Sequence, residues 1–268
     1  MRDQHRITTG ISQLLKLVAR REVEALFSGC GAEAKEFSPF GDLIFPYHKM
    51  GAIDSLNLFD LNELIIFSFY EANRNRYHRV VDIGANIGLH SIILSKCGFE
   101  VRSFEPDPDH FEILRRNLEL NQCVNVEANN AAVSAEAGAQ EFVRVLGNTT
   151  ASHLIGSRDP YGELESFLVD VDSIKPLIEW ADLIKIDIEG HESHVLLATS
   201  RDDWQTTDAL VEIQNDVNAR AVYDHFKNLG VNLFSQSVNW SRVDKVEDMP
   251  ESYRDGTLFI TSKSEVPW

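Results

Sequence analysis

A chain of 268 residues with 43% hydrophobic side chains is long enough to bury a large core without disulfides or a structural metal. Its 25 basic and 42 acidic side chains give a formal charge of -17, which repels nucleic-acid phosphates and argues against a nucleic-acid partner. The three cysteines, Cys30, Cys97 and Cys123, are too irregularly spaced for a disulfide framework or a zinc knuckle. Because no run of some eighteen apolar residues occurs, we expect a cytoplasmic protein with no membrane partner.

Residues 1–75 differ in pattern from the rest of the chain. Apolar side chains recur at helical spacing from Ile7 to Phe27, which predicts one amphipathic helix, and its apolar stripe makes a homodimer possible. The stretch 37–52 places prolines and glycines around a short apolar run, which indicates a hairpin or an extended arm. Asp60 is placed to cap a following helix. We therefore predict a helical and hairpin appendage over 1–75, ahead of a domain over 76–268.

From Arg79 onward, short β-branched runs alternate with helical segments, which is the pattern of a parallel sheet with crossover helices. Strands are predicted at 79–83, 100–104, 124–128, 182–187, 208–213, 231–235 and 257–262, and helices at 87–97, 108–120, 191–200 and 218–229. The predicted fold class is therefore α/β, with a doubly wound, mostly parallel sheet of seven strands. An insert from Ser134 to Ile178, with strand-like pieces at 141–146 and 166–171, is placed to help roof a site.

The loop after the first of these strands has the form of a ligand-binding turn and reads D-I-G-A-N-I-G over residues 82–88. A glycine-rich turn between a strand and a helix lets the backbone approach a ligand, while the helix N-terminus offers unpaired amide donors. Asn86 stands where the dinucleotide fingerprint needs its second glycine, which argues against NAD. The loop residues predicted to hold the ligand are Asp82, Gly84, Ala85, Asn86 and Gly88.

Polar side chains follow the next strands as well. Glu105, followed by Pro106, ends the second strand, where its carboxylate can accept both ribose hydroxyls of an adenosine ligand. Asn130 and Ala131 follow the third strand and suit the edge and face of an adenine ring. The fourth strand ends in D-I-E-G-H-E over 187–192, which delivers ionisable groups to the edge where open α/β sheets bind ligands. We expect the reaction there.

Four segments together resemble the FkbM family of class I methyltransferases. They are the loop 82–88, the F-E-P strand end at 104–106, the helix end at 117–121 and above all K-I-D-I-E-G-H-E over 185–192. The resemblance covers about residues 79–197 and leaves the appendage uncovered. It implies S-adenosylmethionine as the cofactor and transfer of its methyl group to a hydroxyl of a sugar, a polysaccharide or another small metabolite. Residues 187–190 lack the Pro-Pro-aromatic turn of adenine N-methylating enzymes, so base methylation is not expected.

A hydroxyl acceptor is hardly ionised near neutral pH, so a general base is expected to contribute roughly a hundredfold to ten-thousandfold. His191 is the predicted base, with Asp187 or Glu189 orienting it, although a helix-end residue without catalytic duty fits the same position. Asp187 is also expected to contact the cofactor. Some class I O-methyltransferases bind magnesium through carboxylates after strands four and five, here Asp187 and Glu212, so metal dependence stays open.

Other interpretations remain. The chain could methylate the nitrogen of an amine or a peptide, or bind a nucleoside without turnover; an NAD-dependent oxidoreductase is a further alternative. Insert residues that are able to reach over the cofactor or the acceptor are Thr149, Thr150 and His153. The tryptophans at 180, 204 and 240 are able to stack on a sugar, or to serve as core.

Overall fold

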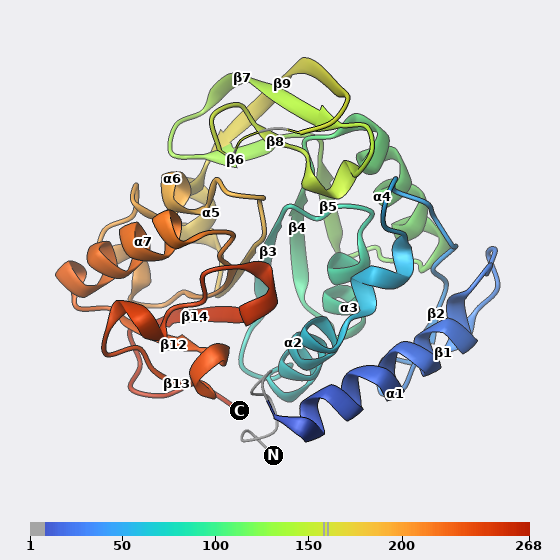
Figure 1. The fold of residues 1–268 in the computed structure, drawn as a ribbon, viewed down its shortest axis with the longest axis horizontal. Coiled ribbons are helices and arrows are strands. Elements are labelled where there is room, and N and C mark those ends of the chain that lie inside the picture. The colour runs from blue at the N-terminus through green and yellow to red at the C-terminus, as the bar shows by residue number, and fades with distance from the viewer. Residues whose placement is uncertain (1–8, 158, 160) are drawn as a thin grey trace.

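The computed structural model describes residues 9–157, 159 and 161–268. Its centre is an eight-stranded sheet in the order β13-β12-β14-β11-β10-β3-β4-β5 (Figure 1). The strands are Arg79–Ile83 (β3), Glu100–Phe104 (β4), Val126–Asn129 (β5), Leu183–Ile186 (β10), Asp208–Glu212 (β11), Asn232–Ser235 (β12), Ser241–Arg242 (β13) and Thr257–Thr261 (β14).

The central sheet confirms the predicted α/β class and corrects the number of strands. Each of the seven predicted strands is present, and those from β5 to β11 in the sheet order run parallel. β14 is antiparallel to both β11 and β12. The eighth strand, β13, has only two residues, which is too short to produce a periodic pattern, and it pairs with β12 at the edge.

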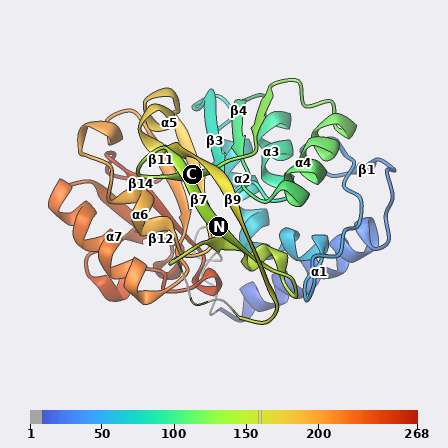
Figure 2. The same ribbon diagram turned by 90° about the horizontal axis from the view of Figure 1, so that it is seen from above.

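Helices cover both faces of this sheet, as Figure 2 shows. One side carries Leu61–Ala72 (α2), Leu89–Lys96 (α3) and Pro108–Leu120 (α4), and the other carries Ile174–Trp180 (α5), Glu192–Leu196 (α6) and Asp216–Leu229 (α7). Successive strand residues face opposite layers, so Val80 packs into the first core and Val81 into the second. The helix predicted at 191–200 ends at Leu196, because the Thr199 hydroxyl donates to the Leu196 carbonyl oxygen.

The appendage packs against the first of these layers. It contains Gly10–Phe27 (α1), an antiparallel hairpin of Lys35–Glu36 (β1) and Asp42–Leu43 (β2), a 3-10 turn at Ser55–Phe59 (η2), and α2. Phe27 stacks on Phe59 with ring centroids 4.9 Å apart, and both belong to the core that α3 also lines. Asp60 caps α2, as predicted, by accepting from the backbone of Asn62 and Glu63. The division at residue 75 stays a prediction.

The first helix leaves an apolar stripe uncovered. Ile11, Leu14, Leu15 and Val18 are each more than two-fifths exposed. The predicted homodimer therefore has an available surface and stays a prediction. The start of the predicted helix at Ile7 lies outside the described residues. Within the described ranges, none of the helices combines the length and the apolar character that crossing a bilayer requires.

The insert forms a smaller sheet of its own over one edge of the central sheet (Figure 1). Its order is β6-β9-β7-β8, with strands Ala132–Ser134 (β6), Gly138–Val145 (β7), His153–Leu154 (β8) and Leu164–Ser173 (β9). The two strand-like pieces predicted in the insert lie in β7 and β9, which pair antiparallel.

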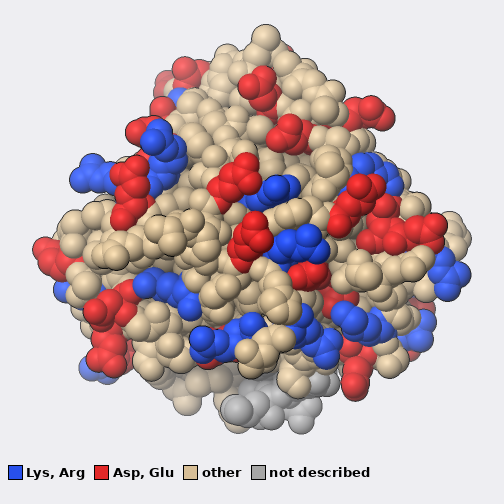
Figure 3. Space-filling model, turned by 180° about the vertical axis from the view of Figure 1, so that it is seen from behind, with Lys and Arg blue, Asp and Glu red and all other residues tan. Residues whose placement is uncertain are grey.

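Figure 3 shows both acidic and basic side chains spread over this face of the molecule.

Candidate functional site

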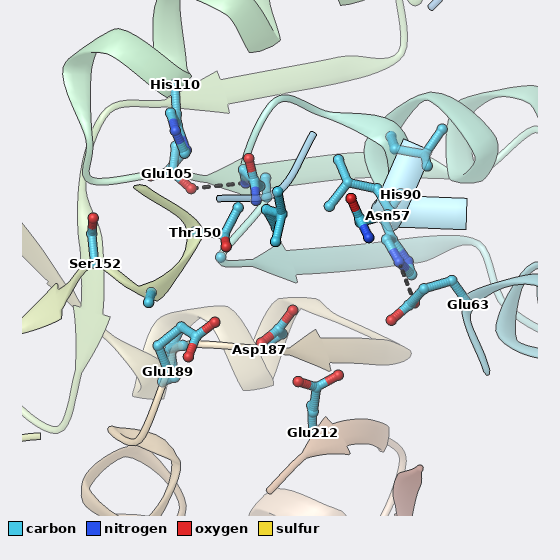
Figure 4. Close-up of a pocket in the computed structure, with 18 of the residues that line it drawn as sticks. Asn57, Glu63, His90, Glu105, His110, Thr150, Ser152, Asp187, Glu189 and Glu212 are labelled. Carbon is cyan, nitrogen blue, oxygen red and sulfur yellow. Dashed lines mark hydrogen bonds and ion pairs between the residues drawn. The ribbon is translucent and has the colours of Figure 1, made fainter. Parts of the chain in front are cut away.

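A cavity of about 1110 Å³ opens where the carboxyl ends of the central strands meet the appendage and the insert. Figure 4 shows side chains from all three parts pointing into it. The predicted site residues that line it are Gly84, Ala85, Asn86, Glu105, Pro106, Ala131, Thr149, Thr150, His153, Asp187, Glu189, His191 and Glu212. Most of the predicted site residues thus line one cavity. The parallel strand order predicts this only for the residues at the strand ends.

The glycine loop touches the end of β10 so closely that a side chain has no room. Gly84 has a φ of 80°, and a Cβ atom added to it would lie 1.8 Å from the Asp187 carbonyl oxygen. Asn86 also adopts a left-handed conformation, with φ 51°, and its side-chain oxygen accepts from the Ile87 backbone. The turn therefore requires glycine at position 84, and Gly84 and Ala85 both line the cavity at the N-terminal side of α3.

Glu105 is held in place by two backbone amides. One carboxylate oxygen accepts from Asn86 N at 2.8 Å and the other from Asp107 N at 2.9 Å. The residue is only 6% exposed, and burial raises its pKa to about 8. Each carboxylate oxygen can accept a second hydrogen bond, so the group remains able to take the hydroxyls of a ribose.

Three predicted cofactor residues lie behind the cavity instead of lining it. The Asn130 side chain donates to the carbonyl oxygens of Glu105, at 2.8 Å, and Pro106, at 3.1 Å, so it braces the end of β4. Gly88 precedes α3 and packs on Leu114. Asp82 is fully buried and accepts from Ser91 Oγ at 2.7 Å. These three residues shape the loop and the strand ends, and their role as cofactor residues stays a prediction.

The turn after β10 is fixed by a buried carboxyl that the sequence reading left without a role. Glu189 and Gly190 have φ values of 52° and 104°. Glu192 accepts from Gly190 N at 2.8 Å with one oxygen and from Asn218 Nδ2 at 2.8 Å with the other. Burial raises the pKa of Glu192 to about 7. This arrangement holds Asp187 and Glu189 at the cavity wall.

His191 lines the cavity, but both of its ring nitrogens are engaged by the insert. Nε2 lies 2.8 Å from Ser134 Oγ, and Nδ1 lies 2.9 Å from Ser157 Oγ. Burial, and then the neighbouring His194, lower its pKa to about 4. His191 therefore links the turn after β10 to the insert through both ring nitrogens. Its role as the general base stays a prediction.

A lysine between carboxylates forms the floor of the cavity. Lys185 Nζ lies 3.4 Å from Asp187 Oδ2 and 3.8 Å from Asp82 Oδ1. Glu212, from the neighbouring strand, accepts from Gln214 Nε2, and burial together with the charge of Asp187 raises its pKa well above the ordinary value. Figure 4 shows Asp187 and Glu212 facing the same space.

The sequence reading missed two further residues of the cavity wall, Glu63 of α2 and His90 of α3, which are joined by a 2.7 Å hydrogen bond. His90 stands two residues after the last loop glycine, and that position is a signal for a ligand-facing side chain. Glu63 carries no comparable signal, because it lies in the appendage.

Aromatic and metal-binding predictions have different outcomes. None of the three candidate tryptophans lines the cavity in the described chain; Trp204 and Trp240 are core, and Trp180 lies under the Arg102 guanidinium at 4.2 Å. Across residues 9–157, 159 and 161–268, no three His, Cys, Asp or Glu side chains are grouped so that they could hold a metal ion. The metal-binding role of Asp187 and Glu212 stays a prediction.

The sheet is doubly wound, with a glycine loop after β3 and a buried carboxylate after β4. These features together are typical of nucleoside-binding α/β proteins. Residues 82–230 match the Methyltransferase FkbM domain. Because this match covers more than half of the chain, the protein belongs to the FkbM methyltransferase family.

Three relatives that are named as methyltransferases also match this chain. Methyltransferase sdnD of Sordaria araneosa is 29% identical over 160 residues, which span 47% of this chain and 62% of that protein. The 31-O-demethyl-FK506 methyltransferase FkbM of Streptomyces tacrolimicus is 29% identical over 52% of this chain and 66% of its own length. The hexuronic acid methyltransferase AglP of Haloferax volcanii is 26% identical over 53% and 58%. The chain thus matches about three-fifths of the length of these relatives.

Among solved structures, the precorrin-6y C5,15-methyltransferase of Geobacter metallireducens GS-15 covers 73% of this chain and 85% of its own, with 13% identity and a TM-score of 0.42. The O-methyltransferase of Bacillus cereus in complex with SAH covers 75% and 81%, with 10% identity and a TM-score of 0.39.

Proposed function

We propose that the protein is an S-adenosylmethionine-dependent methyltransferase that methylates a hydroxyl of a sugar or of another small metabolite. The observation that carries this proposal is the cavity itself, which joins the glycine loop and Glu105 at one end to Asp187 and Glu212 at the other. At about 1110 Å³ it exceeds the ~300–1,000 Å³ common for one small ligand, so it has room for a donor and an acceptor together.

Residues on the β3, β4 and β5 side would hold the donor. The backbone at Gly84 and Ala85 lies against the ligand, the Glu105 carboxylate accepts the ribose hydroxyls, and Ala131 flanks the adenine. The bound donor supplies a methyl group on a sulfonium, which is already a good leaving group. The chain therefore has to align the acceptor oxygen with that methyl group and remove a proton from it.

Asp187 is the group we assign to proton removal. It lines the cavity at the end of β10, and Lys185 Nζ donates to its Oδ2 at 3.4 Å, which leaves Oδ1 able to accept the proton of an acceptor hydroxyl. Glu212 faces the same space from β11 and is suited to hold an acceptor hydroxyl. The names of the relatives include a hexuronic acid enzyme and an FK506 enzyme, which supports an oxygen acceptor on a sugar or a metabolite.

Two measurements test this function. Titration calorimetry should detect binding of S-adenosylhomocysteine to the wild-type chain, with no binding of NAD. Mass spectrometry of reactions with hydroxylated sugars, uronic acids and polyketides should then detect an O-methyl product.

The proton-removal assignment is tested by Asp187→Asn. This variant should lower kcat by about a hundredfold to ten-thousandfold, because a carboxamide is not a base. Asp170→Asn, at an exposed position of β9, is the control and should leave kcat unchanged. An Asp187→Asn enzyme with wild-type kcat would refute the role of Asp187.

A second candidate is methylation of an amine. The carboxylates of Asp187 and Glu189 in the cavity wall would attract a protonated amine and take its proton, which frees the nitrogen lone pair for methylation. Product analysis separates the two functions, because an N-methyl product formed in preference to O-methyl products would favour the amine.

A further inference from the structure

Glu63 belongs to a chain of three side chains that runs from the buried core to the cavity wall. Tyr70 OH lies 3.0 Å from His90 Nδ1, and His90 Nε2 lies 2.7 Å from Glu63 Oε2. Tyr70 is fully buried, whereas the His90 and Glu63 side chains are 12% and 23% exposed and line the cavity. Glu63 and Tyr70 come from α2, outside the residues 82–230 that match the family domain.

The hydrogen bonds fix the state of this chain. Burial raises the pKa of Glu63, but the charge and the hydrogen bond of His90 and the charge of Lys185 outweigh it and bring the pKa below its ordinary value. A carboxylate can only accept, so His90 Nε2 donates to Glu63 Oε2. Glu63 Oε1 has no hydrogen-bond partner among the described residues, and it belongs to a side chain that lines the cavity.

Glu63 is one of several acidic side chains in the cavity wall. Glu63, Asp187 and Glu212 all border the cavity, and the ammonium that interacts with them is that of Lys185. Among the residues that the structure describes, Lys185 makes one hydrogen bond, a long one of 3.4 Å to Asp187, although an ammonium has three donors. Carboxylates in a partly buried wall are stable when a cation lies beside them, so this side of the cavity is suited to a positively charged ligand group.

The position of Glu63 relative to Glu105 indicates which positively charged group of the ligand would lie here. In the sheet order the glycine loop of β3 lies between β4, which ends at Glu105, and β10, which ends at Asp187. Figure 4 shows Glu105 and Glu63 on opposite sides of the cavity, with Asp187 between them. A donor whose ribose lies on Glu105 must therefore extend its remaining part, the sulfur and the amino-acid end, across the loop towards His90 and Glu63.

We propose that Glu63 binds the α-ammonium group of the donor's methionine part, that His90 acts as a positioning residue for it, and that the appendage thereby completes the donor site. This assignment rests on the proposed function. It gives α2 a role in ligand binding, because the carboxylate that recognises the amino-acid end comes from outside the family domain.

The test compares two nucleosides that differ at the amino-acid end. S-adenosylhomocysteine carries the ammonium group, and 5′-methylthioadenosine has the same adenosine and sulfur but no amino-acid part. Both are titrated calorimetrically into the wild-type chain and into Glu63→Gln. Loss of a charge-assisted hydrogen bond should weaken S-adenosylhomocysteine about 10- to 100-fold, whereas 5′-methylthioadenosine should change less than about twofold.

Two further variants sharpen the result. His90→Ala should weaken S-adenosylhomocysteine by a smaller factor than Glu63→Gln and again leave 5′-methylthioadenosine unchanged, which a general loss of structure would not do. Glu71→Gln, on the same helix but at its Arg74 ion pair and away from the cavity, is the control and should bind both nucleosides like the wild type.

The outcomes distinguish an error in the assignment of Glu63 from an error in the proposed function. Unchanged S-adenosylhomocysteine affinity in Glu63→Gln, or equal weakening of both nucleosides, would overturn the assignment of Glu63 while leaving the proposed function standing. A higher KM for the acceptor with unchanged donor affinity would place Glu63 in the acceptor site and overturn it too. Failure of the wild-type chain to bind either nucleoside would refute the proposed function, and the assignment with it.

Discussion

The raised pKa of Glu105 makes donor binding depend on pH. Burial brings this pKa to about 8, whereas a carboxyl that accepts two ribose hydroxyls has to be ionised. With a pKa near 8, about 3% of the free protein is ionised at Glu105 at pH 6.5 and about three quarters at pH 8.5. Since only the ionised fraction binds well, the affinity for the nucleoside should rise about 25-fold between these pH values.

The assay is titration of 5′-methylthioadenosine, which keeps the ribose hydroxyls and has no amino group that ionises in this range. The wild-type chain should bind it more tightly with each step from pH 6.5 to 8.5. Glu105→Gln should bind weakly at every pH and lose the dependence, because a carboxamide does not titrate.

The matched control is Glu100→Gln, at the exposed start of the same strand, which should keep the wild-type profile. A flat wild-type profile would refute the reasoning, and so would a Glu105→Gln profile as steep as that of the wild type. The wild-type profile alone is informative, so the test does not depend on the stability of the variant.

Two predictions concern stability. Gly84→Ala should lower the free energy of unfolding by about 3 kcal/mol or more and abolish nucleoside binding, because the new Cβ atom meets the Asp187 carbonyl oxygen. The control is Gly98→Ala, which has a similar φ but open space around the new Cβ atom and should lose only about 1 kcal/mol. Urea titrations measure both, and equal losses would contradict the steric argument. His191 has a folded pKa of about 4, below its ordinary 6.5, so its contribution is present above pH 6.5 and is lost as the pH falls towards 4. Between pH 6.5 and 4.5 the wild type should lose about 2 to 3 kcal/mol that His191→Asn does not lose, whereas the exposed His78→Asn should behave like the wild type; equal acid sensitivity in all three chains would contradict the burial of His191.

The elements of the fold could be predicted because their signals are local. The three central strands, β3, β10 and β11, are buried on both faces and consist mostly of apolar residues. Asp60 and the loop glycines mark where helices begin. Glu105 could be found for the same reason, since it directly follows a strand and parallel strands end at one edge. The two-residue β13 could not be found, because its pairing with β12 depends on tertiary contacts.

The parts of the site that could not be predicted depend on distant segments. Glu63 reaches the cavity only because α2 packs beside α3, which no pattern near residue 63 indicates. The contacts of His191 could not be predicted, because Ser134 and Ser157 come from the insert, whose path the sequence does not reveal. Asn130 follows β5, as predicted, but its side-chain amide donates to the backbone carbonyl oxygens of Glu105 and Pro106.

The central claim is that the glycine loop and Glu105 bind the adenosine of a sulfonium donor between them, in one cavity. A crystal structure of the wild-type chain with S-adenosylhomocysteine tests it most directly. The account predicts both ribose hydroxyls within hydrogen-bond distance of the Glu105 carboxylate, with the adenine beside Ala131 and the sulfur near Asp187. A nucleoside bound elsewhere, or bound here with its ribose away from Glu105, would contradict it.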